Sequence, residues 1–271
     1  MAAKKQIVVT VAFGANAERL DYTFLTFAQN PYLELHAFII GDRLPEQQFS
    51  PIKYHLRPPD PAFSLPLRDA VYRRWLFIDE VEADYAIVVD NRDVLCMQPL
   101  PELPALLRGA AAGGCVEHEG GRYLPGQGYT SSYINCGVTF WDVKASRKIR
   151  AEIVARGRRY FRNVDDQRSI NEVIQTRYYD DFILLPCQYN FRANIAPVKT
   201  RNWPTVPNLD GVKIYHNGFC LDAAKKLIPT KSKAELPDFP DDGRPLTPRE
   251  QFWRRVEWRL KPHVVGKWFG Q

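Results

Sequence analysis

The sequence predicts one large α/β domain built on a mixed, mostly parallel sheet. Two observations lead to this prediction: short runs of apolar, β-branched residues recur along the chain, and segments with helical spacing separate them. A βαβ rhythm of this kind is typical of a sheet covered by helices. At 271 residues the chain is long enough to bury a sizeable core.

In the first hundred or so residues, the runs expected to form strands are 6–13, 33–41, 52–56 and 85–89. Segments 17–29 and 67–81 between them have helical character. In the second of these helices, four apolar side chains fall at helical spacing: Val71, Trp75, Ile78 and Val81. The run 85–89 is apolar throughout, as in strands that are buried on both faces.

Further along, we expect strands at 110–117, 137–143 and 181–186, and helices at 146–161 and 166–176. Glycine-rich residues 117–129 are interpreted as a mobile loop. The predicted catalytic domain covers 1–228 in two halves, 1–100 and 101–228. A proline-rich linker over 229–248 and a basic, aromatic segment over 249–271 follow it.

Composition restricts the class of protein. The net charge of +6 favours acidic partners such as phosphates, nucleotides or an anionic membrane. The five cysteines are scattered singly, which is typical of a reducing compartment and argues against zinc or disulfide scaffolds. Residues 1–16 are interpreted as leading into a first strand and not as a signal peptide, and no stretch is apolar enough to span a membrane. We therefore expect a cytoplasmic protein.

Charged residues begin where the strand over 85–89 ends. Asp90, Asn91 and Asp93 follow it directly. The carboxyl ends of parallel strands are where ligands bind in open α/β sheets, and carboxylates there can share a hard divalent cation. The alternative is a polar turn that ends the strand.

Three later stretches also carry candidate site residues. Asn135 and Gly137 precede a predicted strand, where glycine alternatively serves a tight turn. Gln167 and Asn171 lie four residues apart and share a helix face, while Asp165 or Asp166 can instead cap that helix. His216 follows a short apolar run, and a single histidine is often only a hydrogen-bonded structural residue.

The order of these stretches is more specific than any one of them. "VTVAFGAN", "AVYRRWLFIDE", "DNRD", "NCGV", "DQRSIN" and "YHNG" follow one another between residue 6 and about residue 227. In this order the chain resembles the retaining glycosyltransferases of family eight, which include glycogenin and the lipooligosaccharide enzymes. It departs from the family pattern at Asn91, where the family has an aspartate, and after His216, where the family continues to Lys-Pro-Trp.

The resemblance implies a GT-A fold, a Mn²⁺ or Mg²⁺ ion and a UDP-sugar donor. The metal ligands that it implies are Asp93, Asp90 and His216. Gln167 and Asp166 would be the catalytic residues, with Gln167 beneath the anomeric carbon and Asp166 on the donor-sugar hydroxyls. The nucleotide-binding half would be 1–100, the acceptor-binding half 101–228. The residues expected to bind the nucleotide sugar are Thr10, Ala12, Phe13, Asn16, Arg73, Arg74, Asn91, Asn135, Gly137 and Asn171, with Arg73 and Arg74 competing for one role.

A glycan or glycolipid acceptor, lipid-linked or of lipopolysaccharide type, is the second expected partner. Its candidate contacts are Tyr129, Tyr133 and Asn190, for which ordinary packing is the alternative. Residues 249–271 set five large aromatic side chains among arginines and lysines: Phe252, Trp253, Trp258, Trp268 and Phe269. This composition is typical of helices that lie on anionic membranes, so we expect peripheral attachment to the inner face of the membrane. No recognition motif indicates nucleic-acid binding.

The expected function is therefore metal-dependent, retaining transfer of a hexose from a UDP-sugar to a glycan. A GT-A-like sugar-nucleotide-binding protein with impaired catalysis is the alternative, because of Asn91. A sugar-nucleotide transferase would require a phosphate loop rich in glycine and lysine after the first strand. The sequence "AFGANAERL" has one glycine and no lysine there.

Overall fold

The structure is a computed structural model. It describes residues 4–20, 23–63, 66–91, 93–118, 122–124, 128–130, 133–158, 166–191, 211–216, 219–221 and 227–229. The predicted linker, apart from Pro229, and the predicted basic, aromatic segment lie outside the described residues. Among the described helices, none combines the length and the apolar character needed to cross a membrane.

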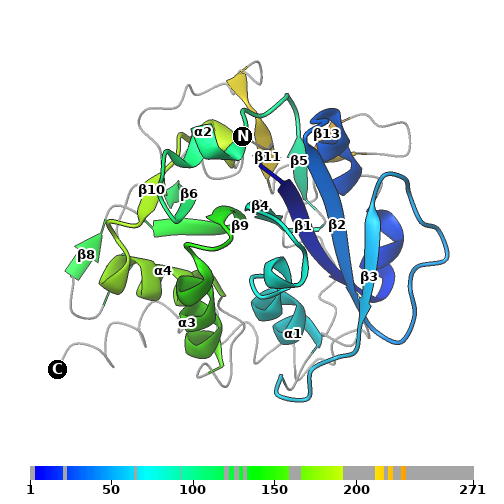
Figure 1. The fold of residues 1–271 in the computed structure, drawn as a ribbon, viewed down its shortest axis with the longest axis horizontal. Helices are drawn as coiled ribbons and strands as arrows, with labels where there is room; N and C mark the ends of the chain where they lie inside the picture. The colour runs from blue at the N-terminus through cyan, green and yellow to red at the C-terminus, as the bar shows by residue number, and fades with distance from the viewer. Residues whose placement is uncertain are drawn as a thin grey trace.

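A seven-stranded sheet forms the centre of the molecule, with strand order β10-β6-β9-β4-β1-β2-β3 (Figure 1). Its strands are β1 (Gln6–Phe13), β2 (Leu33–Ile40), β3 (Lys53–Arg57), β4 (Tyr85–Val89), β6 (Ala112–His118), β9 (Tyr133–Asp142) and β10 (Phe182–Leu184). β9 is antiparallel to its neighbours β4 and β6, while the other pairings are parallel. The predicted mixed, mostly parallel sheet is confirmed.

Helices pack on both faces of this sheet (Figure 1). One core contains side chains from α1 (Pro66–Arg73), α3 (Arg147–Gly157) and α4 (Asp166–Arg177). The opposite core contains side chains from the 3₁₀-helices η1 (Gly14–Arg19) and η2 (Phe24–Gln29) and from α2 (Leu103–Leu107). Two further 3₁₀-helices are η3 (Phe77–Glu80) and η4 (Cys187–Tyr189).

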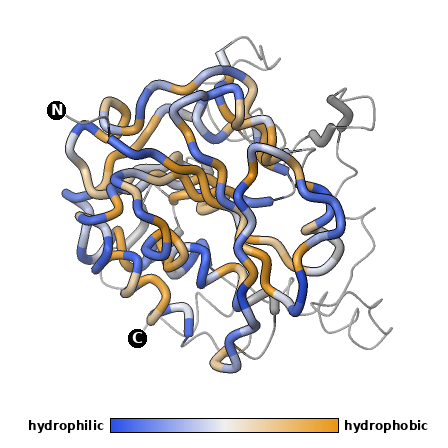
Figure 2. The backbone as a smooth tube through the Cα atoms, turned by 45° about the vertical axis from the view of Figure 1, so that its right-hand side comes forward, coloured by the Kyte–Doolittle hydropathy of each residue, from blue (hydrophilic) through white to orange (hydrophobic). Residues whose placement is uncertain are grey.

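β1 shows why the central strands have apolar residues at successive positions, without the alternation of polar and apolar residues seen in half-exposed strands. Ile7 and Val9 belong to one core and Val8 and Ala12 to the other, because successive side chains point to opposite faces. Ile7, Val8, Val9 and Ala12 have no exposed surface, and each fully buried valine or isoleucine contributes roughly 1.5–3 kcal/mol. Figure 2 shows the hydrophobic stretches gathered in these central strands.

Short strand pairs complete the described elements. β5 (Val94–Cys96) pairs antiparallel with β11 (Ile214–His216), with Val94 opposite His216. β7 (Arg122–Leu124) pairs with β8 (Gly128–Thr130), and β12 (Phe219–Leu221) pairs with β13 (Leu227–Pro229). The β5–β11 pair positions the site, because it joins a late part of the chain to the segment that follows β4.

Arg150 joins helix α3 to the segment after α1. Its side chain has no exposed surface and donates to the Asp79 carboxylate at 2.7 and 2.9 Å. It also donates to the carbonyls of Trp75 and Val143. A buried guanidinium requires several acceptors of this kind, and together they fix the turn that follows Arg74.

Two predicted helices differ from the structure. Segment 17–29 contains parts of η1 and η2 instead of one α-helix. The Thr26 hydroxyl donates to the carbonyl of Thr23, and the Thr23 hydroxyl donates to the carbonyl of Asn91. Such side-chain bonds to the backbone compete with α-helix formation. The predicted helix over 67–81 ends as α1 at Arg73 and resumes as η3.

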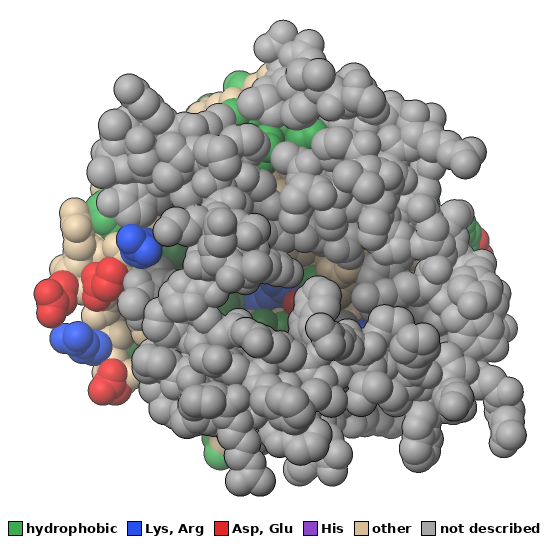
Figure 3. Space-filling model, turned by 180° about the vertical axis from the view of Figure 1, so that it is seen from behind, with side chains coloured by type: hydrophobic (Ala, Val, Ile, Leu, Met, Phe, Trp, Pro, Cys, Tyr) green, Lys and Arg blue, Asp and Glu red, His purple; other side chains and the backbone are tan. Residues whose placement is uncertain are grey.

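The glycine-rich segment 117–129, interpreted as a loop, includes β7 and the beginning of β8. On the surface, described charged side chains of both signs lie beside one another at the left rim of Figure 3, so no patch of a single sign forms there. Solvent-exposed ion pairs contribute little to the stability of the fold.

Candidate functional site

Asp90 directly follows β4 at the carboxyl end of this strand. Its backbone N–H donates to the carbonyl of Gly137 in β9 at 2.9 Å, which continues the β4–β9 ladder by one residue. His216 ends β11, and its N–H donates to the carbonyl of Phe191 at 2.8 Å. Three elements distant in sequence therefore meet at one edge of the sheet.

Asp90, Asp93 and His216 form a cluster in which one potential ligand atom of each lies within 4.8 Å of the others. His216 Nε2 is 3.6 Å from Asp90 Oδ2 and 3.9 Å from Asp93 Oδ1. Two carboxylate oxygens and one imidazole nitrogen form a donor set for Mn²⁺, Mg²⁺ or another divalent cation. The residues present thus fit a metal ion.

Gly137 makes this approach possible. A Cβ at this position would lie 2.2 Å from His216 Cε1 and 2.8 Å from both His216 Nε2 and Asp90 Oδ2. Only glycine leaves room for the imidazole against β9. The sequence had offered a tight turn as the alternative role, but Gly137 lies within β9.

The two neighbouring arginines at the end of α1 have different environments. The Arg74 side chain is 5% exposed and pairs with the carboxylates of Asp90 and Asp166, while its Nη2 also donates to the carbonyl of Cys136 at 3.0 Å. Arg73 instead pairs with Asp69 at 3.0 Å and bonds the carbonyl of Pro58. The structure brings Arg74, and not Arg73, into the cluster.

Arg74 also sets the charge state of Asp90. Burial raises the pKa of Asp90, but the Arg74 guanidinium outweighs it and holds the pKa of this carboxyl well below its usual range. Burial disfavours the charge on Arg74, yet Asp166 and Asp90 raise its pKa. The Asp90 carboxylate is therefore ionised at neutral pH and available to a cation.

Asp166 and Gln167 begin α4 beside β9. The Asp166 carboxylate accepts from the backbone N–H of Gln167 at 2.9 Å, so this residue also serves the helix N-terminus, as the sequence allowed. Gln167 Oε1 accepts from Asn135 Nδ2 at 3.3 Å. The candidate catalytic pair thus lies within one connected network with Arg74 and the acidic cluster.

Sequence reasoning did not single out Cys136 as a site residue. Its Sγ is 3.3 Å from Asp166 Oδ2 and 3.7 Å from Gln167 Oε1. Burial, followed by the neighbouring Asp166 carboxylate, raises the pKa of this thiol well above its usual range. Its position between Asn135 and Gly137 in the sequence was the only signal available.

Two predicted nucleotide-binding residues have their polar atoms engaged within the protein. The Thr10 hydroxyl donates to the carbonyl of Val89 at 3.1 Å, and Asn171, which has no exposed surface, bonds both backbone groups of Ile134. Asn171 also donates to the carbonyl of Gln167 at 2.7 Å. These bonds hold β1 to β4 and α4 to β9, so both residues stabilise the elements that carry the site.

The other predicted contacts lie in several different elements. Ala12 and Phe13 end β1, and Asn16 lies in η1 directly after it. Tyr129 lies in β8 and Tyr133 begins β9. Asn190, predicted as an acceptor contact, is 4% exposed and lies 2.8 Å from His216 Nδ1 through its Oδ1.

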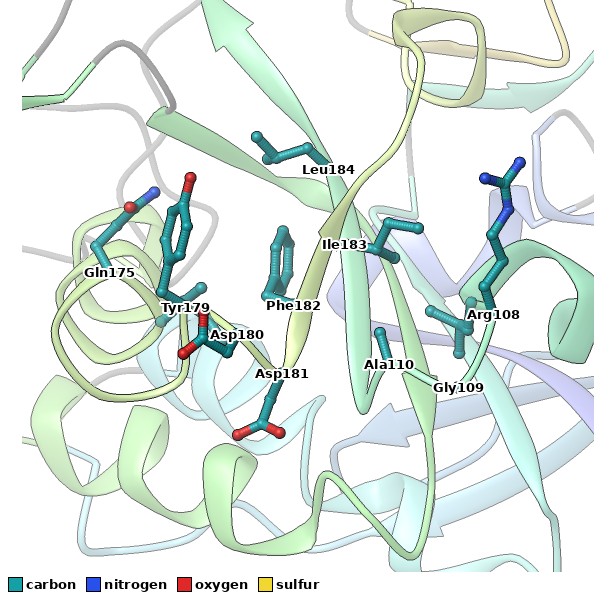
Figure 4. A pocket seen from close by; sticks show the side chains of 12 residues that line it. Arg108, Gly109, Ala110, Gln175, Tyr179, Asp180, Asp181, Phe182, Ile183 and Leu184 are labelled. Atoms are coloured by element: carbon teal, nitrogen blue, oxygen red, sulfur yellow. The ribbon is translucent and has the colours of Figure 1, made fainter.

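A surface cavity lies elsewhere, beside the edge strand β10 (Figure 4). Tyr179, Asp181 and Phe182 line it from one side and Arg108 lines it from another. None of the predicted site residues contributes to its lining. The candidate metal ligands and the candidate catalytic pair lie at the acidic cluster and not at this cavity.

Comparison with solved structures identifies glycosyltransferases with the same fold. An active-site glutamine-to-glutamate mutant of LgtC aligns at a TM-score of 0.57 and 18% identity, covering 78% of this chain and 86% of that one. The galactosyltransferase LgtC with donor and acceptor sugar analogues aligns at a TM-score of 0.56 and 17% identity, again covering 78% of this chain and 86% of that one. The glycosyltransferase GlyE of Streptococcus pneumoniae TIGR4 aligns at a TM-score of 0.53 and 18% identity, covering 79% of this chain and 54% of that one.

No protein-family model and no curated protein matches the chain. The structural likenesses show the fold, and the GT-A-type fold predicted from the order of motifs is confirmed.

Proposed function

We propose that this protein is a metal-dependent, retaining glycosyltransferase that moves a hexose from a UDP-sugar to a glycan acceptor. One observation carries the proposal: Asp90, Asp93 and His216 converge beside the Arg74–Asp166 pair at the carboxyl edge of a sheet with the glycosyltransferase fold. An acidic metal site next to further fixed carboxylates fits a substrate that carries both a diphosphate and a sugar.

Asp90, Asp93 and His216 would hold the divalent cation, Mn²⁺ or Mg²⁺. A cation bound there would neutralise the negative charge that develops on the departing UDP. Arg74 keeps Asp90 ionised and fixes one of its oxygens, which leaves Oδ2 directed toward His216. The protein therefore holds this carboxylate in place before any ligand binds.

The nucleotide would lie over the end of β1 and the segment that follows β4. Thr10, Ala12, Phe13, Asn16 and Asn91 belong to these segments. The hydrogen bond from the Thr23 hydroxyl to the Asn91 carbonyl, at 2.7 Å, joins the segment after β4 to the start of η2. Asn135 and Gly137 of β9 would contribute as well, while Asn171 acts indirectly by holding α4 to β9.

Asp166 and Gln167 would contact the donor sugar. Asp166 accepts hydroxyl hydrogens with a carboxylate that Arg74 also binds, at 2.5 Å. Gln167 carries an amide, which is a poor nucleophile, so its oxygen would stabilise an oxocarbenium-like centre while the acceptor attacks from the face that the leaving group vacates. An active-site glutamine was also the residue replaced in the LgtC mutant.

Replacement of Gln167 tests this role. If its oxygen acts mainly in the transition state, Gln167→Ala should lower kcat far more than it raises the KM for the donor. Steady-state kinetics measure both constants. A raised KM with unchanged kcat would reduce Gln167 to a residue that only binds substrate.

A glycan or glycolipid of lipopolysaccharide type is the proposed acceptor, with Tyr129 and Tyr133 as candidate contacts. Residues 249–271 would attach the enzyme to the anionic inner face of the membrane, where such acceptors are exposed. The support is compositional, since aromatic side chains suit the interface and basic side chains suit lipid phosphates.

Donor turnover tests the proposed function. Purified protein is incubated with Mn²⁺ and a panel of UDP-hexoses, with and without a chelator, and UDP release is measured. We expect chelator-sensitive release from one donor, and anomeric retention in the product by proton NMR. Tight UDP binding without release from any donor would instead support the catalytically impaired sugar-nucleotide-binding protein that Asn91 suggested.

A further inference from the structure

A chain of buried amides joins His216 of the acidic cluster to Gln167. Asn190 lies between His216 and Asn135, with Oδ1 2.8 Å from His216 Nδ1 and Nδ2 2.9 Å from Asn135 Oδ1. Asn135 Nδ2 in turn lies 3.3 Å from Gln167 Oε1. Asn135, Asn190 and His216 are each at most 4% exposed, so these contacts are made away from solvent.

The direction of every bond in this chain follows from one backbone group. The N–H of Gly137 can only donate, and it bonds Asn135 Oδ1 at 2.9 Å. The Asn190 atom that meets the same oxygen must therefore be its NH₂ group, so the Asn190 oxygen faces His216. An oxygen can only accept, and His216 Nδ1 must therefore carry the hydrogen.

The tautomer of His216 follows directly. With the hydrogen on Nδ1, the neutral ring presents the bare lone pair of Nε2 toward Asp90 and Asp93. The distances of 3.6 and 3.9 Å exceed those of a hydrogen bond and leave three acceptors facing one another. A cation satisfies all three at once, whereas the opposite tautomer would direct a hydrogen into the ligand position.

The other end of the chain orients Gln167. Because Asn135 Oδ1 is held by Gly137 and Asn190, its NH₂ group is directed at Gln167 and selects the oxygen of that amide. A Gln167 side chain that presented its nitrogen instead would place two donors against each other. The single donor-to-acceptor direction of these hydrogen bonds therefore fixes both the tautomer of His216 and the orientation of the Gln167 amide.

We propose that Asn190 is a positioning residue, which sets His216 to bind the metal through Nε2 and, through Asn135, holds the Gln167 oxygen in place. This assignment rests on the proposed function, and it replaces the earlier expectation that Asn190 contacts the acceptor. Residues that bind the second nitrogen of a metal-ligating histidine typically change metal affinity by about 10–100-fold when they are replaced.

Two substitutions of Asn190 separate the two halves of the proposal. Asn190→Leu has a similar volume but no acceptor for the Nδ1 hydrogen. Asn190→Asp keeps an acceptor for His216 but sets a carboxylate oxygen against Asn135 Oδ1, which breaks the connection to Gln167. Asn30→Leu is the matched control, because Asn30 is also a buried amide, 1% exposed, and its partners are the Leu100 N–H, the Phe27 carbonyl and Cys96 Sγ, none of which belongs to the cluster or to the amide chain.

The probe is Co²⁺ added to the full-length protein and observed by proton NMR. A histidine bound through Nε2 shows its Nδ1 hydrogen as a strongly shifted signal that disappears in D₂O, and His216→Ala identifies this signal by its loss. Calorimetry of Mn²⁺ with UDP gives the metal-dependent affinity of each variant. Steady-state kinetics add kcat and KM for the donor.

We expect Asn190→Leu to lose the shifted signal and to weaken Mn²⁺-dependent affinity about 10–100-fold. Asn190→Asp should keep both and should lower kcat with little change in KM. Asn30→Leu should keep signal, affinity and kcat although its melting temperature falls. If Asn190→Leu does not fold, Asn190→Asp still decides: loss of the signal overturns the tautomer assignment, and wild-type kcat overturns the connection to Gln167.

Other outcomes identify which claim fails. Retention of signal and affinity in Asn190→Leu, or equal losses in Asn30→Leu, would overturn the role of Asn190 and leave the proposed function intact. A wild-type protein that releases UDP with Mn²⁺ but shows no shifted signal would have the same consequence. A wild-type protein that neither binds Mn²⁺ with UDP nor turns over any donor would refute the proposed function and this inference together.

Discussion

Arg73 and Arg74 show what spacing along the chain cannot decide. Both arginines follow the same helical run, and the motif resemblance left them as equal candidates. The helix α1 ends at Arg73. The Arg73 side chain pairs with Asp69 and bonds the Pro58 carbonyl, both outside the cluster. Arg74 lies one residue further, where the backbone turns toward β4 and β9 and the side chain meets Asp90 and Asp166. The helix end, which the sequence pattern placed too late, thus determines which arginine enters the site.

Gly137 allows the proposed metal site to be tested without removing a proposed ligand. Gly137→Ala would place a Cβ 2.2 Å from His216 Cε1 and 2.8 Å from Asp90 Oδ2, so the imidazole has to leave its position. We expect Mn²⁺-dependent UDP affinity to fall about 10–100-fold, as for other changes that misplace a ligand. Calorimetric titration of the folded variant measures this loss.

Gly157→Ala is the matched control for that experiment. Its Cβ would lie 2.1 Å from Tyr72 Cε1, in the contact between α3 and α1. It should lower the free energy of unfolding by about 1–3 kcal/mol, as overpacking does, and leave the affinity unchanged. Unchanged affinity in Gly137→Ala would show that His216 does not lie against β9 as described.

Elements that are buried on both faces were the most predictable. The apolar runs gave β1 and β4 with the predicted bounds and β2 to within one residue, because burial on two faces leaves no polar position inside the strand. The helix predicted over 17–29 was wrong, since η2 depends on a bond from Thr23 to the carbonyl of Asn91, far along the chain. A local pattern contains no information about such a partner.

The pairing of β2 with β3 predicts a pH dependence of stability. His36, 3% exposed in β2, bonds His55 of β3 at 2.9 Å. Burial lowers the pKa of His36 to about 4, against the opposing effect of the Glu34 carboxylate. The unfolded chain takes up a proton near pH 6.5, whereas the folded protein does so only near pH 4.

The free energy of unfolding should therefore fall as the pH decreases from about 6.5 to about 4, by about 2–3 kcal/mol from this group. Urea unfolding at several pH values measures the decrease. His36→Gln keeps a neutral polar side chain and should remove most of this pH dependence. The same slope in wild type and His36→Gln would assign the effect to other groups.

At the scale of the whole molecule, the order of motifs predicted which segments meet at the carboxyl edge of the sheet. Asp90 and Asp93 follow a predicted strand directly, so their place could be inferred from the sequence. His216 reaches them through the antiparallel pairing of β11 with β5. That pairing joins segments more than a hundred residues apart, which is why the resemblance, and not the local pattern, indicated His216.

Truncation after Lys233 tests the separate role proposed for the C-terminal segment. We expect the shortened protein to fold and to release UDP from its donor, while it loses co-sedimentation with anionic vesicles and activity toward a lipid-embedded acceptor. Each basic group near an anionic surface contributes about 1 kcal/mol, and several are removed together. A large fall in melting temperature with vesicle binding intact would show instead that the segment packs on the catalytic domain.

The metal centre is the central claim, and Asp93→Ala tests it most directly. Asp93 contributes a carboxylate oxygen 3.9 Å from His216 Nε2, and its side chain is 26% exposed, so its loss should not unfold the domain. The measurement is calorimetric titration of UDP into wild-type and Asp93→Ala protein, with and without Mn²⁺. We predict that Mn²⁺ strengthens UDP binding in the wild type and has no effect in the variant, at an unchanged melting temperature. Equal Mn²⁺-dependent UDP affinity in the two proteins would contradict the assignment of this cluster as the metal site.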